Sequence, residues 1–418
     1  MILFQVLISI FYLLFFGISL KKSVWAIQFI VFLLPTYLIS FNLGLVPTNL
    51  LEGMIIVLFL SQLSRLNIRK ILQIIAQRRL LFSGVFFLFL GLIVSTFFSN
   101  NLITSLGILK SWFIIPIIFS LIASNKTSKN TAPIILNSLA LSGLTISIIA
   151  IIYFILGETT YDGRIAAFFN HPNFLAMYLS PCFIISFSNT LKNPYRKYRF
   201  YWLLSSVLII FTTILTQSIG ALISIIIAST IYLLLTKHIT RKNKFLLGLS
   251  FLLLVIVSIS ILSPKINNLF TTSRSSMHSR IIIWRSATRI LEDNLLFGIG
   301  AGNFQSYYLN YQKYFPPYLE WSSPQPHNVF LAFWIQLGIF GFLGFLLILI
   351  WFYRSGVAIL KKEALSASLI AIMSVILIHG LIDTTYWKND LSIVFWLLIA
   401  LMILMSHNQH KTNYKLRE

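Results

Sequence analysis

Acidic residues are scarce in this sequence, which has ten Asp and Glu side chains among 418 residues. Two candidate ligands, His379 and Asp383, without further carboxylates or cysteines make only a weak metal site, and we expect no metal and no cofactor. Cysteine is almost absent: Cys182 stands alone, which excludes an internal disulfide and leaves the redox compartment undefined. Cys182 lies in an apolar run, where we expect it to pack in the core.

Hydrophobic residues are abundant, at 57% of the chain against 10% that are charged. They form repeated runs of about 20 residues, the length that a helix needs to cross a bilayer. The runs are continuously apolar and lack the alternation of barrel strands. We predict an all-α, polytopic transmembrane helical bundle, with residues 1–418 as a single integral membrane domain. The opening run, 2–20, has no basic residue before it and no small-residue cleavage pattern after it, so we expect a spanning helix or an anchor.

The apolar runs predict about 12 or 13 spanning helices. Their ranges are 2–20, 24–43, 50–66, 80–98, 102–123, 132–156, 173–187, 200–215, 219–235, 245–262, 328–353, 364–382 and 391–406.

The formal net charge of +22 does not indicate a nucleic-acid partner, because the basic residues fall in short clusters between apolar runs. The clusters recur after every second predicted helix, so all lie on one side of the membrane, which the positive-inside rule makes cytoplasmic. The N-terminus is then outside and the C-terminus inside. The clusters are Lys21/Lys22, Arg69/Lys70/Arg78/Arg79, Lys126/Lys129, Lys192/Arg196/Lys197/Arg199, Lys237/Arg241/Lys242/Lys244, Arg354/Lys361/Lys362 and Lys411/Lys415/Arg417.

Two of the predicted external loops carry arginine, against the general pattern of charge. The short loop, 157–172, contains Arg164, and the long loop, 263–326, contains several cations including Arg280. A connection of about 60 residues is longer than most, so we expect the long loop to be partly helical and to have a function. Arginine presents a planar set of donors suited to phosphate and stays charged at neutral pH. The two loops therefore indicate an anion site, and a lipid phosphate or pyrophosphate is the obvious membrane-borne anion.

The segment 279–304 of the long loop has the periodicity of an amphipathic helix lying against the outer membrane surface. Arg280 opens this helix beside Ser279, where the helix dipole favours an anion. For Arg285 and Arg289 we favour structural roles over substrate binding. Arg289 and Asp293 have the i,i+4 spacing of an ion pair, and Arg285 can reach lipid headgroups. Gly298, Gly300 and Gly302 lack the strand of a dinucleotide fingerprint, so we expect a tight turn.

Three histidines lie near predicted helix ends. His171 and Asn173 flank Pro172, a combination typical of a helix start, and His171 fits a polar interfacial residue better than a catalyst. His379 and Asp383 have i,i+4 spacing. This spacing suits either a functional site, which could hold a metal, or a structural His–Asp pair facing the bundle.

His327 precedes Asn328 at the mouth of the predicted helix 328–353. As a helix-entry residue it could be only a cap neighbour, but beside external arginines an imidazole can accept a proton from an incoming hydroxyl.

Three segments together resemble a known family. They are GRIAAFFNHPN (163–173), SRIIIWRSATRILEDNLLFGIGAGNF (279–304), and PHN-x-x-L followed by LGIFGFLG (326–344). In this order, and in the predicted outer loops, they resemble the O-antigen ligase and Wzy polymerase superfamily.

The resemblance implies a metal-independent, inverting glycosyltransferase of cell-surface polysaccharide biosynthesis. Its active site would face outward from the bacterial cytoplasmic membrane, and an undecaprenyl-pyrophosphate-linked glycan would be the donor for a glycan, lipid or protein acceptor. Carried onto this sequence, it implies that Arg164 and Arg280 bind the pyrophosphate and that His327 is the catalytic base. Asn173, Arg285, Asn328, His379 and Asp383 are possible supporting residues.

Two other classes of function remain open. A transporter of a small anion such as bicarbonate would need polar residues through the depth of the membrane, where Lys110 and Gln217 are the few candidates. A non-catalytic scaffold of an envelope complex would tolerate loss of the arginines and His327.

Overall fold

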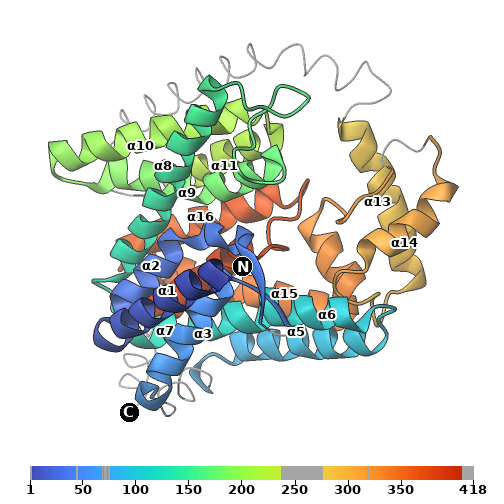
Figure 1. Ribbon diagram of the computed structural model, residues 1–418, viewed down its shortest axis with the longest axis horizontal. Helices are drawn as coiled ribbons and strands as arrows, with labels where there is room; N and C mark the ends of the chain where they lie inside the picture. Colours follow the sequence, from blue (N-terminus) through green and yellow to red (C-terminus); the bar gives the residue numbers. More distant parts are fainter. Residues whose placement is uncertain are drawn as a thin grey trace.

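A computed structural model describes residues 2–43, 46–67, 69, 73, 76–236, 276–317 and 321–406. Helices dominate these residues and pack side by side in one bundle, with α13 and α14 at one end (Figure 1). The helices before residue 237 are α1 (Ile2–Lys21), α2 (Ser23–Phe32), α3 (Leu50–Gln62), α5 (Arg79–Phe97), α6 (Leu102–Ile108), α7 (Ile115–Lys126), α8 (Ala132–Ile155), α9 (Pro172–Lys192), α10 (Arg196–Leu215) and α11 (Ile219–Leu235). Those after residue 275 are α13 (Ser276–Asp293), α14 (Phe304–Tyr311), α15 (Val329–Ile359), α16 (Ala364–His379) and α17 (Asn389–Met405).

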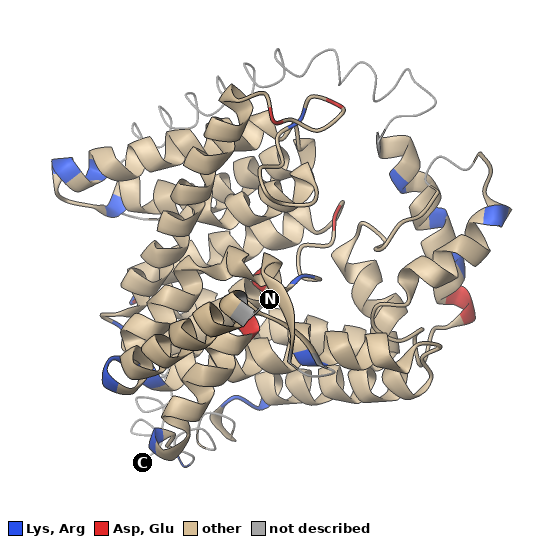
Figure 2. Ribbon diagram, in the orientation of Figure 1, with Lys and Arg blue, Asp and Glu red and all other residues tan. Residues whose placement is uncertain are grey.

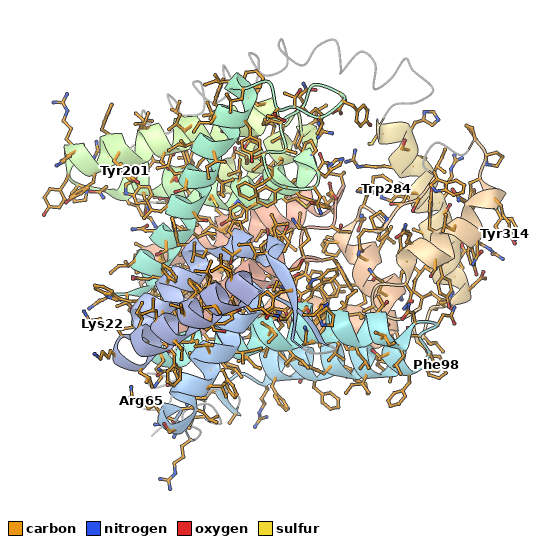
Figure 3. All side chains as sticks on the ribbon, in the orientation of Figure 1. Lys22, Arg65, Phe98, Tyr201, Trp284 and Tyr314 are labelled. Atoms are coloured by element: carbon orange, nitrogen blue, oxygen red, sulfur yellow. The ribbon has the colours of Figure 1, made fainter. Side chains whose placement is uncertain are left out.

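Six of the described helices are long and apolar enough to cross a membrane: α5, the continuous run 102–126, α8, α9, α10 and α15. Shorter apolar helices, α1, α2, α11, α16 and α17, fill the bundle between them. The prediction of an all-α, polytopic membrane protein is confirmed, while the predicted helix 245–262 lies outside the described residues. Lys and Arg concentrate toward the ends of the bundle, and most of the ribbon between them carries neither (Figure 2). Lys22 and Arg65 lie at the opposite end from Trp284 and Tyr314 (Figure 3).

The predicted span 24–43 is wrong. Its helix, α2, ends at Phe32, a short 3-10 turn (Leu34–Leu38) follows, and strands β1 (Ser40–Leu43) and β2 (Val46–Asn49) then form an antiparallel hairpin. Pro35 stands at the start of the 3-10 turn, where it has no backbone N–H to continue the helix. The predicted helix 102–123 is present as one continuous run, Leu102–Lys126, in which the segment between α6 and α7 (Leu109–Ile114) is π-helical.

The predicted helix 328–353 does not cross the bundle in one piece. Gly338 has φ of 65° and ψ of −172° inside α15. Phe333 and Phe345 would be about 18 Å apart along a straight helix, yet their stacked rings have centroids 3.9 Å apart. The segment 329–337 therefore folds back against the segment that follows Gly338. His327 lies just before this returning segment, so the turn at Gly338 helps to set its position.

Glycines let the part of α15 that follows Gly338 lie against α5 (Figure 1), with the backbones of the two helices in direct contact. A Cβ on Gly91 would lie 2.2 Å from the backbone nitrogen of Gly341, and one on Gly344 would lie 2.3 Å from that of Leu88. Small residues permit this approach, which is a common means of packing helices in a membrane. The pair α5 and α15 is thus a close-packed support for the turn at Gly338.

The external helix α13 is confirmed as amphipathic, although it ends at Asp293 rather than continuing toward residue 304. Its apolar face, with Ile283, Ala287 and Ile290, packs on Phe304 and Tyr308 of α14. The predicted glycine turn is present between the two helices: Gly298, Gly300 and Gly302 have φ of 70°, 82° and 86°. The turn is bonded to α15, since Ile299 N donates to Ile335 O at 2.9 Å.

Replacing Gly338 by alanine should destabilise the protein, because a Cβ there would lie 2.3 Å from Leu296 O at a left-handed backbone position. A positive φ with extended ψ is essentially confined to glycine and costs about 1–3 kcal/mol for other residues, and the overlap adds to it. Thermal unfolding of the purified protein in detergent measures the change.

Gly107→Ala is the matched control, because a Cβ at Gly107 meets nothing within 4 Å. Alanine should leave the midpoint unchanged or raise it, through about 1 kcal/mol of helix propensity. Equal midpoints for the two variants would contradict the strained turn.

Candidate active site

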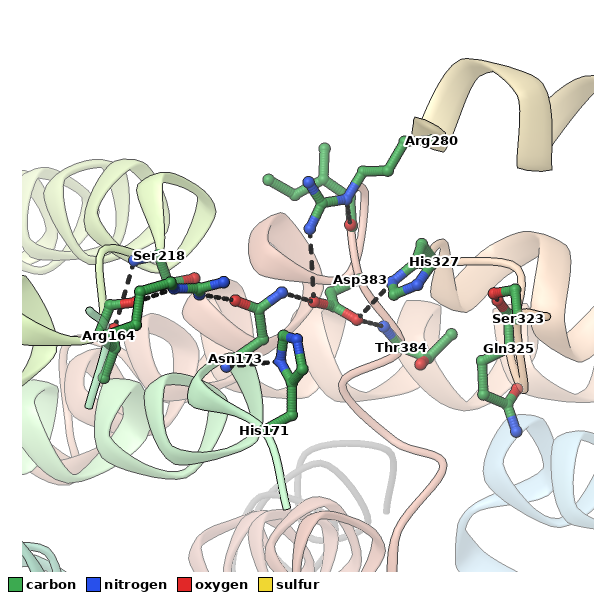
Figure 4. A network of polar contacts seen from close by, with 12 residues as sticks. Arg164, His171, Asn173, Ser218, Arg280, Ser323, Gln325, His327, Asp383 and Thr384 are labelled. Carbon is green, nitrogen blue, oxygen red and sulfur yellow. Dashed lines mark hydrogen bonds and ion pairs between the residues drawn. The ribbon is translucent and has the colours of Figure 1, made fainter. Parts of the chain in front are cut away.

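The carboxylate of Asp383, in the buried connection between α16 and α17, is the centre of a polar network (Figure 4). Its Oδ1 lies 3.1 Å from Nδ1 of His327, and its Oδ2 accepts a hydrogen bond from Nδ2 of Asn173 at 3.1 Å. Nη2 of Arg280 lies 3.9 Å from the same Oδ2. One carboxylate thus joins three segments that are far apart in the sequence.

The surroundings of Asp383 keep it ionised although only 2% of the residue is exposed. Burial alone would raise the pKa of Asp383, but the charge and hydrogen bond of His327, with the charge of Arg280, hold that pKa well below its usual range. The backbone N–H of Thr384 also donates to Oδ1, at 2.9 Å. Asp383 is therefore a permanent negative charge between the site's cations.

An ionised Asp383 determines the protonation of the His327 ring. A carboxylate accepts hydrogen bonds only, so a neutral imidazole facing it carries its proton on Nδ1 and leaves a lone pair on Nε2. The described residues place no hydrogen-bond partner on Nε2, and 29% of the side chain is exposed. The ring is thus arranged to accept a proton from a group outside the network.

The backbone around His327 is fixed from three directions. Asn328 caps the first segment of α15 through Oδ1, which accepts from Phe330 N and Leu331 N at 2.9 and 3.0 Å. Asn328 Nδ2 donates to Leu381 O at 3.0 Å, which ties this cap to the connection that carries Asp383. Nε1 of Trp284 on α13 donates to the carbonyl of His327 at 3.2 Å. These bonds hold His327 in a left-handed conformation, with φ of 47°.

Arg164 reaches the network from the loop between α8 and α9. Its Nη2 donates to Oδ1 of Asn173 at 2.5 Å, and its Nε donates to the carbonyl of Thr216, at the end of α10, at 2.7 Å. Asp162 lies 3.7 Å away, and 12% of the Arg164 side chain is exposed. Burial lowers the pKa of Arg164, but a guanidinium remains charged at neutral pH.

Arg280 enters from the other side, on α13. The structure describes this helix from Ser276, so Arg280 lies beyond the first turn, and the prediction that it opens the helix beside Ser279 is wrong. Nε of Arg280 donates to Ile382 O at 2.9 Å, beside the longer ion pair with Asp383. Arg164 and Arg280 are thus two fixed guanidinium groups on either side of one carboxylate. Each is oriented by a backbone carbonyl, and guanidinium groups held in this way are able to bind an anion.

The other candidate residues divide between the network and its surroundings. His171, expected to be a polar interfacial residue, is the N-cap of α9: its Nδ1 accepts from Asn173 N at 3.1 Å, and burial and Arg164 lower its pKa. His379 is buried, yet the histidine that contacts the Asp383 side chain is His327, so the proposed His379–Asp383 pair is wrong. Arg285 is exposed on α13, and Arg289 pairs with Asp293 at 3.7 Å, as its spacing predicted.

Sequence reasoning missed the groups that orient the site. Backbone carbonyls of Thr216 and Ile382 hold the arginines, and the indole of Trp284 holds the backbone carbonyl of His327. Carbonyl positions leave no signal in a sequence, whereas Asp383 could have been ranked higher as one of only ten acidic residues. Groups of three or more metal-ligating side chains are not found among the residues that the structure describes.

The ionisation of Asp383 should make stability depend on pH. A lowered pKa in the folded state stabilises the protein above the unfolded pKa, near 4, and this contribution is lost as pH falls below it. The difference in unfolding free energy between wild type and Asp383→Asn should therefore shrink by about 1 kcal/mol from pH 6 to pH 3. Denaturant titrations in detergent at both pH values measure it.

Asp162→Asn is the control, because Asp162 also faces Arg164 but is 35% exposed in its side chain. Its effect should be small at both pH values. A difference for Asp383→Asn that is the same at pH 3 and pH 6 would contradict a lowered pKa.

Comparison with known proteins bears on the second half of the site. No curated protein matches the chain. Residues 204–346 match a family described as O-Antigen ligase, and this segment includes both Arg280 and His327. The match covers about a third of the chain; it supports the resemblance to the O-antigen ligase and Wzy superfamily that the three motifs indicated, and a function in membrane glycan assembly.

Proposed function

We propose that this protein is a glycosyltransferase of surface-polysaccharide assembly that moves or polymerises glycan from an undecaprenyl-pyrophosphate-linked donor onto an acceptor hydroxyl. The observation that carries the proposal is the convergence of Arg280 and His327 on Asp383, which Arg164 joins through Asn173. The family match supports glycan assembly in general. The proposed location is the outer, periplasmic face of the bacterial cytoplasmic membrane.

The proposed reaction is a single displacement. Nε2 of His327 takes the proton of the acceptor hydroxyl while its oxygen attacks the anomeric carbon of the donor sugar. The bond from that carbon to the pyrophosphate oxygen breaks, and the pyrophosphate leaves with the electron pair. Attack opposite the leaving group inverts the configuration at the anomeric carbon.

The charges of the site fit this displacement. Negative charge grows on the pyrophosphate as the bond breaks, and Arg164 and Arg280 are held where fixed cations can stabilise it. Positive charge grows on His327, and Asp383 accepts its Nδ1–H and stabilises the imidazolium. Asp383 is thus a positioning residue, and the proposed chemistry needs no metal.

His327→Ala should abolish transfer, with a fall of at least about 10²-fold, because the acceptor loses its base. The measurement is lipid-linked and surface glycan in a deletion strain complemented with each variant. Undecaprenyl-linked glycan should accumulate, as single repeats if a polymerase is lost and as full chains if a ligase is lost.

His278→Ala is the matched control, since His278 is an exposed histidine on the same external helix, α13. It should leave glycans at the wild-type level. Wild-type transfer by His327→Ala, at equal membrane expression, would overturn the proposed base.

Arg280→Lys keeps the charge but removes the planar guanidinium group. That group can donate to Ile382 O and, at the same time, to the proposed substrate. Transfer should fall by about tenfold or more, while Arg289→Lys on the exposed face of the same helix should not change it. Rates with a purified lipid-linked donor measure the effect. Equal rates for the two lysine variants would show that Arg280 supplies only diffuse charge.

Anion transport is the alternative class, and the observation that favours it is the presence of two lysines, Lys388 buried and Lys110 partly exposed, within the bundle. Lys110 and Lys388 lie among the helices, but each already faces a carboxylate: Lys110 is 2.9 Å from Glu52, and Lys388 is 3.8 Å from Asp390. A transported anion would have to displace these partners. Uptake of labelled bicarbonate by proteoliposomes, lost in Lys388→Gln, would favour transport over transfer.

A further inference from the structure

A second group of arginines lies at the far end of α5 from the external loop. Phe98, which follows α5, stacks on Phe297 of that loop with ring centroids 4.6 Å apart, so the start of α5 is the remote end. There, Arg78, Arg79 and Arg354 line a cavity of about 310 Å³. Trp351, Ser355 and Ser406 complete much of its wall. We call this cavity the arginine pocket.

Arg78 is built into the pocket rather than displayed on the surface. The residue is 4% exposed, and its Nη2 donates to Ile403 O at 3.0 Å and lies 3.4 Å from Oγ of Ser406. Burial lowers the pKa of Arg78 to about 10, so the guanidinium stays charged at neutral pH. A basic residue that served only to orient the chain in the membrane would not need to be buried and anchored in this way.

The pocket favours an anion through several groups at once. Its described lining contains three arginines, two serine hydroxyls and no carboxylate. Arg79 and Leu80 are also the first two residues of α5, and Arg78, at the N-cap position, supplies no side-chain cap. The amides of this first turn and the helix dipole add to the positive potential.

The position of the pocket along the helices points to a lipid. A candidate membrane span begins at Arg79, and another ends at Ile359, just beyond Arg354, so the cavity lies at the level of headgroups. Phe82 and Phe86 follow Arg79 at i+3 and i+7, on one face of α5, and both are about half exposed. This face offers acyl chains an apolar surface directly below a phosphate in the pocket.

We propose that the arginine pocket binds the headgroup of an anionic phospholipid, with its phosphate among Arg78, Arg79 and Arg354. Basic pockets between membrane helices are suited to such headgroups. The bound lipid would join the ends of α5, α15 and α17. The proposal is independent of glycan transfer, because it involves neither His327 nor the external arginines.

The test uses purified, delipidated full-length protein in neutral detergent, titrated with phosphatidylglycerol, phosphatidylcholine or inorganic phosphate. Phosphatidylglycerol should raise the thermal unfolding midpoint in a saturable way, and the other two should not. An equal rise with phosphatidylcholine would overturn a site for anionic lipid. An equal rise with inorganic phosphate would show an anion site that does not recognise lipid.

Variants then locate the site. Arg79→Gln combined with Arg354→Gln should weaken phosphatidylglycerol binding at least tenfold, and both side chains belong to exposed residues, so the fold should persist. Ser355→Asp, which adds a carboxylate to the pocket, should weaken it independently by charge repulsion. Arg196→Gln combined with Lys197→Gln, at the exposed start of α10, is the control. Equal loss of binding in the control would mean a diffuse charge effect and would overturn the pocket.

Discussion

Asp383 is a carboxylate buried in the connection between α16 and α17, and segments far apart in the sequence meet on it. A buried ionised group is tolerated only when cations or donors surround it. Here Asn173, Arg280, His327 and the amide of Thr384 supply them. The requirement to satisfy this one charge therefore brings together residues separated by more than two hundred positions of sequence. It also gives the imidazole a defined tautomer and leaves its outer nitrogen available.

The packing of α5 against α15 supports the position of His327 beside Asp383. Glycines at the contact allow backbone approach, and the reversal at Gly338 returns the chain toward the centre of the bundle. Aromatic stacking of Phe333 on Phe345 then fixes the returning segment. Larger side chains at the contact between α5 and α15 would shift the turn at Gly338 and, with it, His327. The apolar packing of the membrane part thus determines the geometry of a polar site that it does not itself contain.

Sequence reasoning predicted the helical class, the two arginine-bearing loops, the amphipathic helix and the glycine turn, because each leaves a local pattern of residues. It failed at 24–43 and at Gly338, where continuous hydrophobicity conceals a change of direction: apolar residues face lipid and protein equally well, so a long run carries no information about a fold-back. It also paired Asp383 with His379 by helical spacing, whereas the helix ends at His379 and the carboxylate turns toward His327. Contacts between distant segments, such as Arg164 with Thr216, have no local signature at all.

The site consists of two groups of residues, each held together by its own hydrogen bonds. The bond from Trp284 to the carbonyl of His327 belongs to the first group. It fastens α13, which carries Arg280, to the loop that carries His327, so a displacement of α13 would carry both side chains with it. Arg164 is fastened instead to the ends of α9 and α10, through Asn173 and Thr216. The bonds of Asp383 to Asn173, Arg280 and His327 are the described polar contacts that join the two groups. Displacing the loop 157–172 would therefore change the separation of the two guanidinium groups while leaving the distance from base to Arg280 as it was.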